Sequence, residues 1–106
     1  MNASEFQPIA VDATADTVDI EWSDGVKHEI DNRVLRGNCP CASCNDVREA
    51  GNRITVSAGV RANKLWLVGG YALGFEWSDG HHDGMFSFRL LRDLGQACEA
   101  HREAPP

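Results

Sequence analysis

The tetrapeptide Trp22-Ser23-Asp24-Gly25 recurs in this chain as Trp77-Ser78-Asp79-Gly80. Alternating apolar residues precede both copies, and a leucine-arginine pair follows each of them, at Leu35-Arg36 and Leu91-Arg92. Two copies are too few for a solenoid, which needs about three repeats or more. The pattern therefore indicates either an internal duplication or one favourable turn sequence that is used twice.

The first copy predicts a β-hairpin whose register can be worked out. Apolar and polar residues alternate over residues 17–22, which gives one apolar strand face. A two-residue turn would mix core and solvent residues on one face, whereas a loop over residues 23–25 keeps the faces consistent. This loop also places Gly25 at the left-handed position where glycine is favoured. The resulting pairs are Trp22 with Val26, Ile20 with His28 and Val18 with Ile30.

Other stretches predict further strands and one main helix. Residues 54–57, 64–68 and 71–77 read as strands, and residues 32–36 read as a short helix that stops at Gly37. Ser87 is expected to cap the C-terminal helix. The apolar face of that helix comprises Leu90, Leu91, Leu94, Ala97, Cys98 and His101.

The length of 106 residues fits a single domain. We expect this domain to span residues 1–106, with a core over about 7–100 and frayed ends. Apolar residues make up 42% and charged residues 25% of the chain, which is typical of a globular protein and not of a disordered one. Because predicted strands outnumber helices, the expected fold class is α+β: mostly antiparallel β-sheet with a C-terminal helix and a metal-binding cysteine loop.

Charge and hydropathy exclude several classes of protein. Sixteen acidic against ten basic residues give a net charge of −6, which disfavours nucleic acid as a partner. No apolar run approaches the roughly 18 residues of a membrane helix, so no membrane partner is expected. The N-terminus lacks the basic start and apolar stretch of a signal peptide. We therefore expect a cytoplasmic protein whose four cysteines stay reduced.

The loop Cys39-Pro40-Cys41-Ala42-Ser43-Cys44 carries three thiols within six residues. Packing explains one buried cysteine well, but three on one loop outside any apolar periodicity are better explained by a metal. A tight turn can bring thiolates to about 2.3 Å from one Zn²⁺, or onto an iron–sulfur cluster. Redox chemistry at Cys41 and Cys44 is the alternative, followed by a purely structural role for the cysteines.

A closed tetrahedral site needs a fourth ligand besides the loop cysteines. Alignment of the two repeated turns sets His81 where the first copy has Val26, and ligation is a reason for a histidine at an apolar position. His81 is thus the predicted fourth ligand, with His82 in reserve. The other candidates have simpler explanations as a core residue (Cys98), a tail residue (His101) and a strand residue (His28).

Several further segments combine with the cysteine loop into a specific pattern. They are IEWSDG (20–25), LRGNCPCASC (35–44), GYA (70–72), WSDGH (77–81), GMFSF (84–88) and LLR (90–92). With them the chain resembles the gamma-butyrobetaine hydroxylase-like N-terminal domain. That module precedes the catalytic domain in gamma-butyrobetaine and trimethyllysine hydroxylases and also occurs alone in bacteria. The resemblance implies a stand-alone bacterial member of unknown function, with zinc bound by Cys39, Cys41, Cys44 and His81.

The chain is not expected to be an enzyme. His81-His82-Asp83 contains the H-x-D element of a non-haem iron site, but the only later histidine is His101, on a predicted helix. The chain also ends where the family's catalytic domain would begin, so we expect no oxygenase activity. Neither a G-x-S-x-G nucleophile motif nor a G-x-x-x-x-G-K phosphate loop is present in the sequence.

Three functions are compatible with the sequence. The first is a zinc module without chemistry of its own, whose filled Cys₃His site is structural and which acts through a protein partner or self-association. Its local charge of about −1 could be partly neutralised by Arg36. The second is an accessory protein of iron–sulfur cluster assembly or transfer, and the third is a thiol redox protein that uses Cys41 and Cys44.

Overall fold

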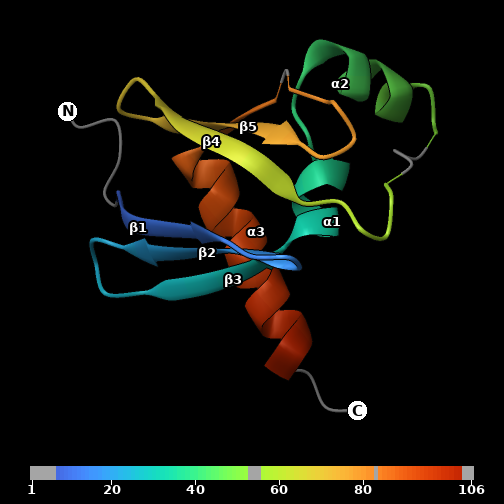
Figure 1. The fold of residues 1–106 in the computed structure, drawn as a ribbon. Coiled ribbons are helices and arrows are strands. Elements are labelled where there is room, and N and C mark those ends of the chain that lie inside the picture. The colour runs from blue at the N-terminus through green and yellow to red at the C-terminus, as the bar shows by residue number, and fades with distance from the viewer. Residues whose placement is uncertain (1–6, 53–55, 83, 104–106) are drawn as a thin grey trace.

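The computed structural model describes residues 7–52, 56–82 and 84–103, which form two three-stranded antiparallel sheets and three helices (Figure 1). The first sheet contains β1 (Pro8–Ala13), β2 (Thr17–Trp22) and β3 (Lys27–Asp31), in that order. The second contains β4 (Ala62–Val68), β5 (Ala72–Trp77) and β6 (Met85–Ser87), also in sequence order. The helices are α1 (Asn32–Gly37), α2 (Ala42–Glu49) and α3 (Phe88–Glu103). The predicted α+β class is confirmed, with the strands divided between two sheets.

The chain consists of two similar halves, each with three strands followed by a helix. In both halves the amide of the turn tryptophan donates to the carbonyl of the residue after the turn glycine. The distance is 2.8 Å from Trp22 N to Val26 O and 2.9 Å from Trp77 N to His81 O. Because the same order of elements surrounds both turns, internal duplication explains the repeat better than a turn sequence used twice.

The predicted hairpin register is confirmed. Strands β2 and β3 pair Ile20 with His28 and Val18 with Ile30. Gly25 has the expected left-handed backbone, with φ of 91°, and the equivalent Gly80 has φ of 88°. Any residue other than glycine would have a strained backbone at either position.

Apolar side chains from both halves form one core. Nearly equivalent positions contribute from each half, and each of these residues is at most 1% exposed. They are Val18, Ile20, Trp22, Ile30 and Leu35 from the first half, and Leu73, Phe75, Trp77, Phe86 and Leu91 from the second. Burial of one such side chain stabilises a fold by about 1.5–3 kcal/mol. The two halves therefore share one core.

The C-terminal helix α3 lies across both sheets and contacts β3 and β6 (Figure 1). It begins as predicted, because the Ser87 hydroxyl accepts a hydrogen bond from the Leu90 amide at 3.0 Å. The helix comes very close to β3 at Gly95, where an added Cβ would lie 2.5 Å from the His28 ring. Neither α3 nor any other described helix is long and apolar enough to cross a membrane.

The apolar face of α3 is narrower than predicted. Leu90, Leu91, Leu94 and Cys98 pack on the core, and Cys98 thus has the packing role that was expected of it. Ala97 is exposed, so its place on this face was predicted wrongly. Ala97 follows Leu94 by three residues and Leu90 by seven, so helical spacing alone did not distinguish it from the positions that pack on the core. The side chain of His101 lies outside the described residues.

Several local elements differ from the prediction. Strands β1 and β6 and helix α2 were not expected, because none of them has a clear apolar periodicity. Of the predicted strand 54–57, residues 54 and 55 lie outside the described part of the chain, and Val56 and Ser57 are not in a strand. Gly37 is the last residue of α1 and does not stop it, since Asn38 is the C-cap.

The two halves exchange ion pairs between their helices and turns. Arg92 on α3 makes two hydrogen bonds to Asp24 in the first turn, at 2.7 and 3.1 Å. Arg36 on α1 donates from Nε to Asp79 in the second turn, at 2.8 Å. Each leucine-arginine pair of the sequence therefore supplies the arginine for the turn of the other half.

Candidate metal centre

Three cysteines and one histidine converge beside the end of α1. Their ligand atoms, one from each of Cys39, Cys41, Cys44 and His81, all lie within 4.8 Å of one another. Cys39 follows α1, Cys41 is the N-cap of α2, and Cys44 lies in the first turn of α2. His81 follows the turn after β5, so the group joins the two halves of the chain. A Cys₃His group with this arrangement can hold a metal ion.

The distances within the group suit one four-coordinate ion. The Nε2 atom of His81 lies 3.1, 3.4 and 3.7 Å from the sulfurs of Cys39, Cys41 and Cys44, respectively. In a tetrahedron with zinc–sulfur bonds of about 2.3 Å and a zinc–nitrogen bond of about 2.0–2.1 Å, a sulfur and a nitrogen stand about 3.5 Å apart. The donor set and its spacing therefore fit zinc.

Polar side chains of α2 hold the cysteine loop. Arg48 donates to the carbonyl oxygens of Gly37 and Cys39, with a distance of 3.0 Å to the former. Asn45 donates from Nδ2 to the Pro40 carbonyl at 3.1 Å and accepts at Oδ1 from Arg48 at 2.7 Å. These bonds satisfy the carbonyl of Gly37 at the end of α1 and two carbonyls of the loop that follows it. They explain why a helix without an apolar stripe forms at this place.

His81 is held from the second turn by Asp79. The Oδ1 atom of Asp79 accepts from the His81 amide at 3.0 Å, and its Oδ2 accepts from Arg36 Nε at 2.8 Å. Burial alone would raise the pKa of Asp79, but these two hydrogen bonds hold that pKa below its usual value. The Nη1 atom of the same arginine lies 3.7 Å from the sulfur of Cys44. Sequence reasoning did not recognise Asp79, although its place in the repeated turn was a signal.

Gly84 leaves room for the sulfur of Cys39. A Cβ at position 84 would lie 2.6 Å from Cys39 Sγ and 3.3 Å from the Phe86 ring. Cys39 is fully buried, so its sulfur cannot swing away into solvent. Gly84 is therefore part of the site, and the sequence alone offered no reason for a glycine there.

The thiols have different environments. Burial raises the pKa of Cys39 to about 12, and the other two sulfurs add to this effect. At Cys41 burial also acts to raise the pKa, but the Ser43 hydroxyl at 3.4 Å and the neighbouring thiols outweigh it and lower the pKa to about 6. A bound cation would override this difference, because a coordinating thiol is deprotonated outright.

The other candidate ligands lie elsewhere. His82 is exposed, with its Nδ1 atom 3.2 Å from the Gly80 carbonyl. His28 is buried in the first hairpin, where its Nδ1 accepts a hydrogen bond from Trp22 Nε1 at 3.1 Å. Cys98 packs against the core. The structure thus brings together the four predicted ligand residues, and their binding of a metal stays a prediction.

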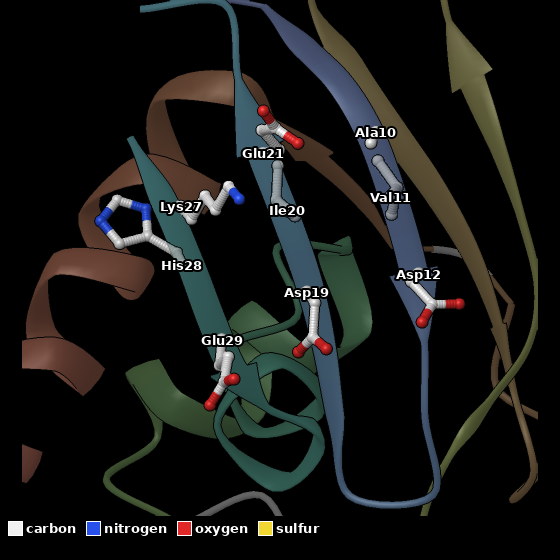
Figure 2. Close-up of a pocket in the computed structure, with 9 residues that line it drawn as sticks. All are labelled: Ala10, Val11, Asp12, Asp19, Ile20, Glu21, Lys27, His28 and Glu29. Atoms are coloured by element: carbon white, nitrogen blue, oxygen red, sulfur yellow. The ribbon is translucent and has the colours of Figure 1, made fainter. Parts of the chain in front are cut away.

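A separate hollow of about 320 Å³ lies on the first sheet. Figure 2 shows acidic side chains from neighbouring strands on its open side, while the His28 ring points to the helix side of β3. The charged lining residues are Asp12, Asp19, Glu21, Lys27 and Glu29. The lining includes no residue of the Cys₃His group, so this hollow is a charged sheet surface apart from the candidate metal centre.

The fold and the site define a small α+β domain, built from two similar halves, with a Cys₃His group that can hold a metal ion. Among proteins of curated function, none matches the chain significantly. The chain belongs to the family of gamma-butyrobetaine hydroxylase-like N-terminal domains, whose family model matches residues 9–92. The resemblance seen in the sequence motifs is thereby confirmed. The matched model is an N-terminal domain and includes no catalytic domain.

Two solved structures have a similar fold. One is the crystal structure of a protein of unknown function from Acidithiobacillus ferrooxidans, described as a member of the DUF971 family. It is 27% identical with a TM-score of 0.70, and the alignment covers 84% of this chain and 92% of that one. The other is an NMR solution structure with 22% identity and a TM-score of 0.71, over 99% of this chain and 88% of that one. At that identity the second likeness concerns the fold alone.

Proposed function

We propose that this chain is a small zinc-binding module whose Cys₃His site is structural and which has no catalytic activity of its own. The observation that carries the proposal is the position of His81 Nε2, within 3.7 Å of all three loop sulfurs. Four protein ligands fill a tetrahedron, whereas a catalytic zinc keeps one position open for water or substrate. A closed donor set therefore favours a structural role.

Zinc suits the group better than an iron–sulfur cluster does. A cluster contains several iron ions and spreads its protein ligands over them. Here the four ligand atoms all lie within 4.8 Å of one another, which is close enough for a single ion. Three cysteines and one histidine are also a usual ligand set of structural zinc. Cluster assembly or transfer stays the alternative function, and visible colour distinguishes the two.

Zinc at this position would connect parts of the chain that are far apart in sequence. The three cysteines lie between α1 and the start of α2, and His81 follows the second turn. Apparent binding free energies of structural zinc are about 10–16 kcal/mol. That range is comparable with the whole stability of a small domain, about 5–15 kcal/mol. Bound zinc would therefore stabilise the contact between the halves, and it supplies no redox chemistry.

We further propose that the module acts in the cytoplasm through contacts with a protein partner. Trp66 on β4 and Met85 on β6 both pair with Gly74 of β5, so they lie on one face of the second sheet, and they are 42% and 54% exposed. Aromatic residues and methionine are enriched at protein interfaces. The ring of Trp66 is held in place over Gly74, where an added Cβ would lie 2.5 Å from it. The net charge of −6 opposes self-association and favours a partner with a basic rim.

Elemental analysis of anaerobically purified protein, with a visible spectrum of the same sample, tests the metal. About one zinc per chain without colour is expected from a single tetrahedral site. Iron with inorganic sulfide and a brown chromophore would instead support a function in iron–sulfur cluster assembly or transfer. If the protein contains neither metal, the thiol redox function is the remaining alternative. Cys44→Ser should lose the metal, while Cys98→Ser, which changes a cysteine outside the group, should keep it.

A photo-crosslinker placed at position 85 tests the partner surface, with the exposed position 49 on α2 as the matched control. We expect one protein to be captured from position 85 and not from position 49, and its purified form to bind Trp66→Ser more weakly than the parent. Sedimentation of the pure protein at high concentration should show a monomer. A dimer that Trp66→Ser dissociates would replace the partner with a second copy of the chain.

A further inference from the structure

The arginines of the two repeated leucine-arginine pairs are used differently. Arg92 directs two N–H groups at Asp24, at 2.7 and 3.1 Å, in a bidentate ion pair. Arg36 donates Nε to Asp79 at 2.8 Å and turns Nη1 toward the sulfur of Cys44 at 3.7 Å. Of these two equivalent arginines, Arg36 contacts a cysteine sulfur, and its half of the chain is the one that contains the cysteine loop.

Arg36 is well suited to hold a sulfur ligand. Its side chain is 11% exposed, and charges interact more strongly away from water. A guanidinium is always charged, and its rigid fork of N–H groups can serve two acceptors at once. Here the two acceptors are the carboxylate of Asp79, which also holds the amide of His81, and the sulfur of Cys44. Arg36 therefore contacts the candidate ligand Cys44 directly and the candidate ligand His81 through Asp79.

The three sulfurs differ in what covers them. Cys39 is fully buried and lies against Gly84. Cys44 is 5% exposed and contacts Arg36. Cys41 is only partly buried, at the start of α2. A solute that approaches from solvent therefore meets Cys41 before the other two.

We propose that Arg36 is a positioning residue of the metal site, which fixes the Cys44 sulfur, offsets part of the negative charge around the metal and leaves Cys41 as the ligand that exchanges. This inference rests on the proposed metal-binding function. Three thiolates, one neutral imidazole and a divalent ion carry a net charge of about −1, and the guanidinium lies between this group and the Asp79 carboxylate. A thiolate that accepts an N–H from a buried cation stays on the metal. The uncovered thiolate is the one that an electrophile or a competing thiol reaches.

The test compares zinc-loaded wild-type protein with the variants Arg36→Met and Arg92→Met. Each protein is treated with N-ethylmaleimide, and mass spectrometry locates the alkylated cysteine over time. Zinc release is followed in parallel with a chromogenic chelator. In the wild type we expect Cys41 to be alkylated first among the loop cysteines. In Arg36→Met we expect zinc release about 10- to 100-fold faster, the range for loss of a partner of a metal ligand, and alkylation of Cys44 together with Cys41.

Arg92→Met separates this role from simple stabilisation. It breaks the equivalent ion pair in the other half without touching a sulfur. We expect this variant to release zinc at close to the wild-type rate and to keep Cys41 as the first site of alkylation. Lysine in place of Arg36 should restore part of the retention, since it keeps the charge without the fork.

Each outcome decides the matter. Equal acceleration in Arg36→Met and Arg92→Met would overturn the inference, because a general loss of stability would then explain both. Alkylation of Cys44 before Cys41 in the wild type would overturn it as well. If Arg36→Met does not fold, Arg36→Lys takes its place, and a wild-type rate of zinc release in that variant refutes the inference. Wild-type protein that takes up no zinc refutes the proposed function instead, so the two failures are distinguishable.

Discussion

Replacement of Gly84 by alanine tests whether the sulfur of Cys39 lies where the metal site requires it. The new Cβ would stand 2.6 Å from Cys39 Sγ. Ordinary contacts of carbon with a large atom are about 3.5–4.0 Å, so the sulfur would have to move by about 1 Å. Because both residues are buried, no open space is available on either side to absorb this shift.

The size of the effect follows from the tolerance of the site. Metal–ligand distances vary by about 0.2 Å, so a shift of about 1 Å takes the sulfur out of the tetrahedron. Changes next to a ligand weaken metal binding by about 10- to 100-fold, equivalent to about 1.4–2.8 kcal/mol. Overpacking adds about 1–3 kcal/mol of lost folding stability. We expect Gly84→Ala to show both losses.

Competition with a chelator of known zinc affinity measures the first loss, and thermal melting of the zinc-loaded protein measures the second. Gly70→Ala is the matched control, since an added Cβ there meets nothing within 4 Å and the backbone is not left-handed. The control should keep wild-type affinity. If Gly84→Ala binds zinc as tightly as the control, the sulfur of Cys39 is not held against position 84 and the reasoning is refuted.

Three further changes test other parts of the structure. Cys41→Ser should lower the zinc content and the melting temperature together, and full metal content with unchanged melting would contradict its place among the ligands. Gly95→Ala places a Cβ 2.5 Å from the His28 ring and should lower the free energy of unfolding, measured with urea, by about 1–3 kcal/mol. At a solvent-exposed helix position the same change would stabilise the helix. A stabilised variant would mean that α3 and β3 are less closely packed. The hydrogen bond from Arg92 holds the pKa of Asp24 below its usual 3.8, so this ion pair stabilises the fold above about pH 4 and is lost as the pH falls through the lower folded value. In thermal melts the advantage of the wild type over Asp24→Asn should therefore shrink between about pH 5 and pH 3, and an advantage that stays constant would count against the pair.

The parts of the fold that could be predicted are those determined by residues close together in the sequence. The first hairpin has an apolar face with a period of two residues and a glycine at its left-handed turn position, so strand and register followed from neighbouring residues. Ser87 and the leucines after it likewise located α3. Helix α2 was missed because its stabilising bonds run from Arg48 and Asn45 to carbonyls of the preceding loop, and no local pattern encodes them.

The candidate site divides in the same way. The three cysteines were visible as a cluster, and His81 followed from comparison of the two turns. The roles of Asp79 and Gly84 depend on contacts with residues more than 40 positions away, Arg36 and Cys39. Such contacts exist only once the halves are packed together, which is why they needed a structure.

The exchange of ion pairs between the halves has a consequence for symmetry. Arg36 of the first half meets Asp79 of the second, and Arg92 of the second half meets Asp24 of the first. This is the rule of an isologous interface, in which residue i of one subunit contacts residue j of its twin and the reverse. These reciprocal contacts are the pattern expected if two copies of an ancestral unit that formed a twofold dimer had been joined end to end.

The metal centre is the place where this twofold relation is broken. His81 stands where the other half has Val26, and Gly95, the third residue after Arg92, stands where Cys39 follows Arg36. In the second half the chain continues as helix α3 at the point where the first half turns into the cysteine loop. A symmetric dimer would carry two such ligand groups in equivalent places, whereas the described part of this chain has a single Cys₃His group.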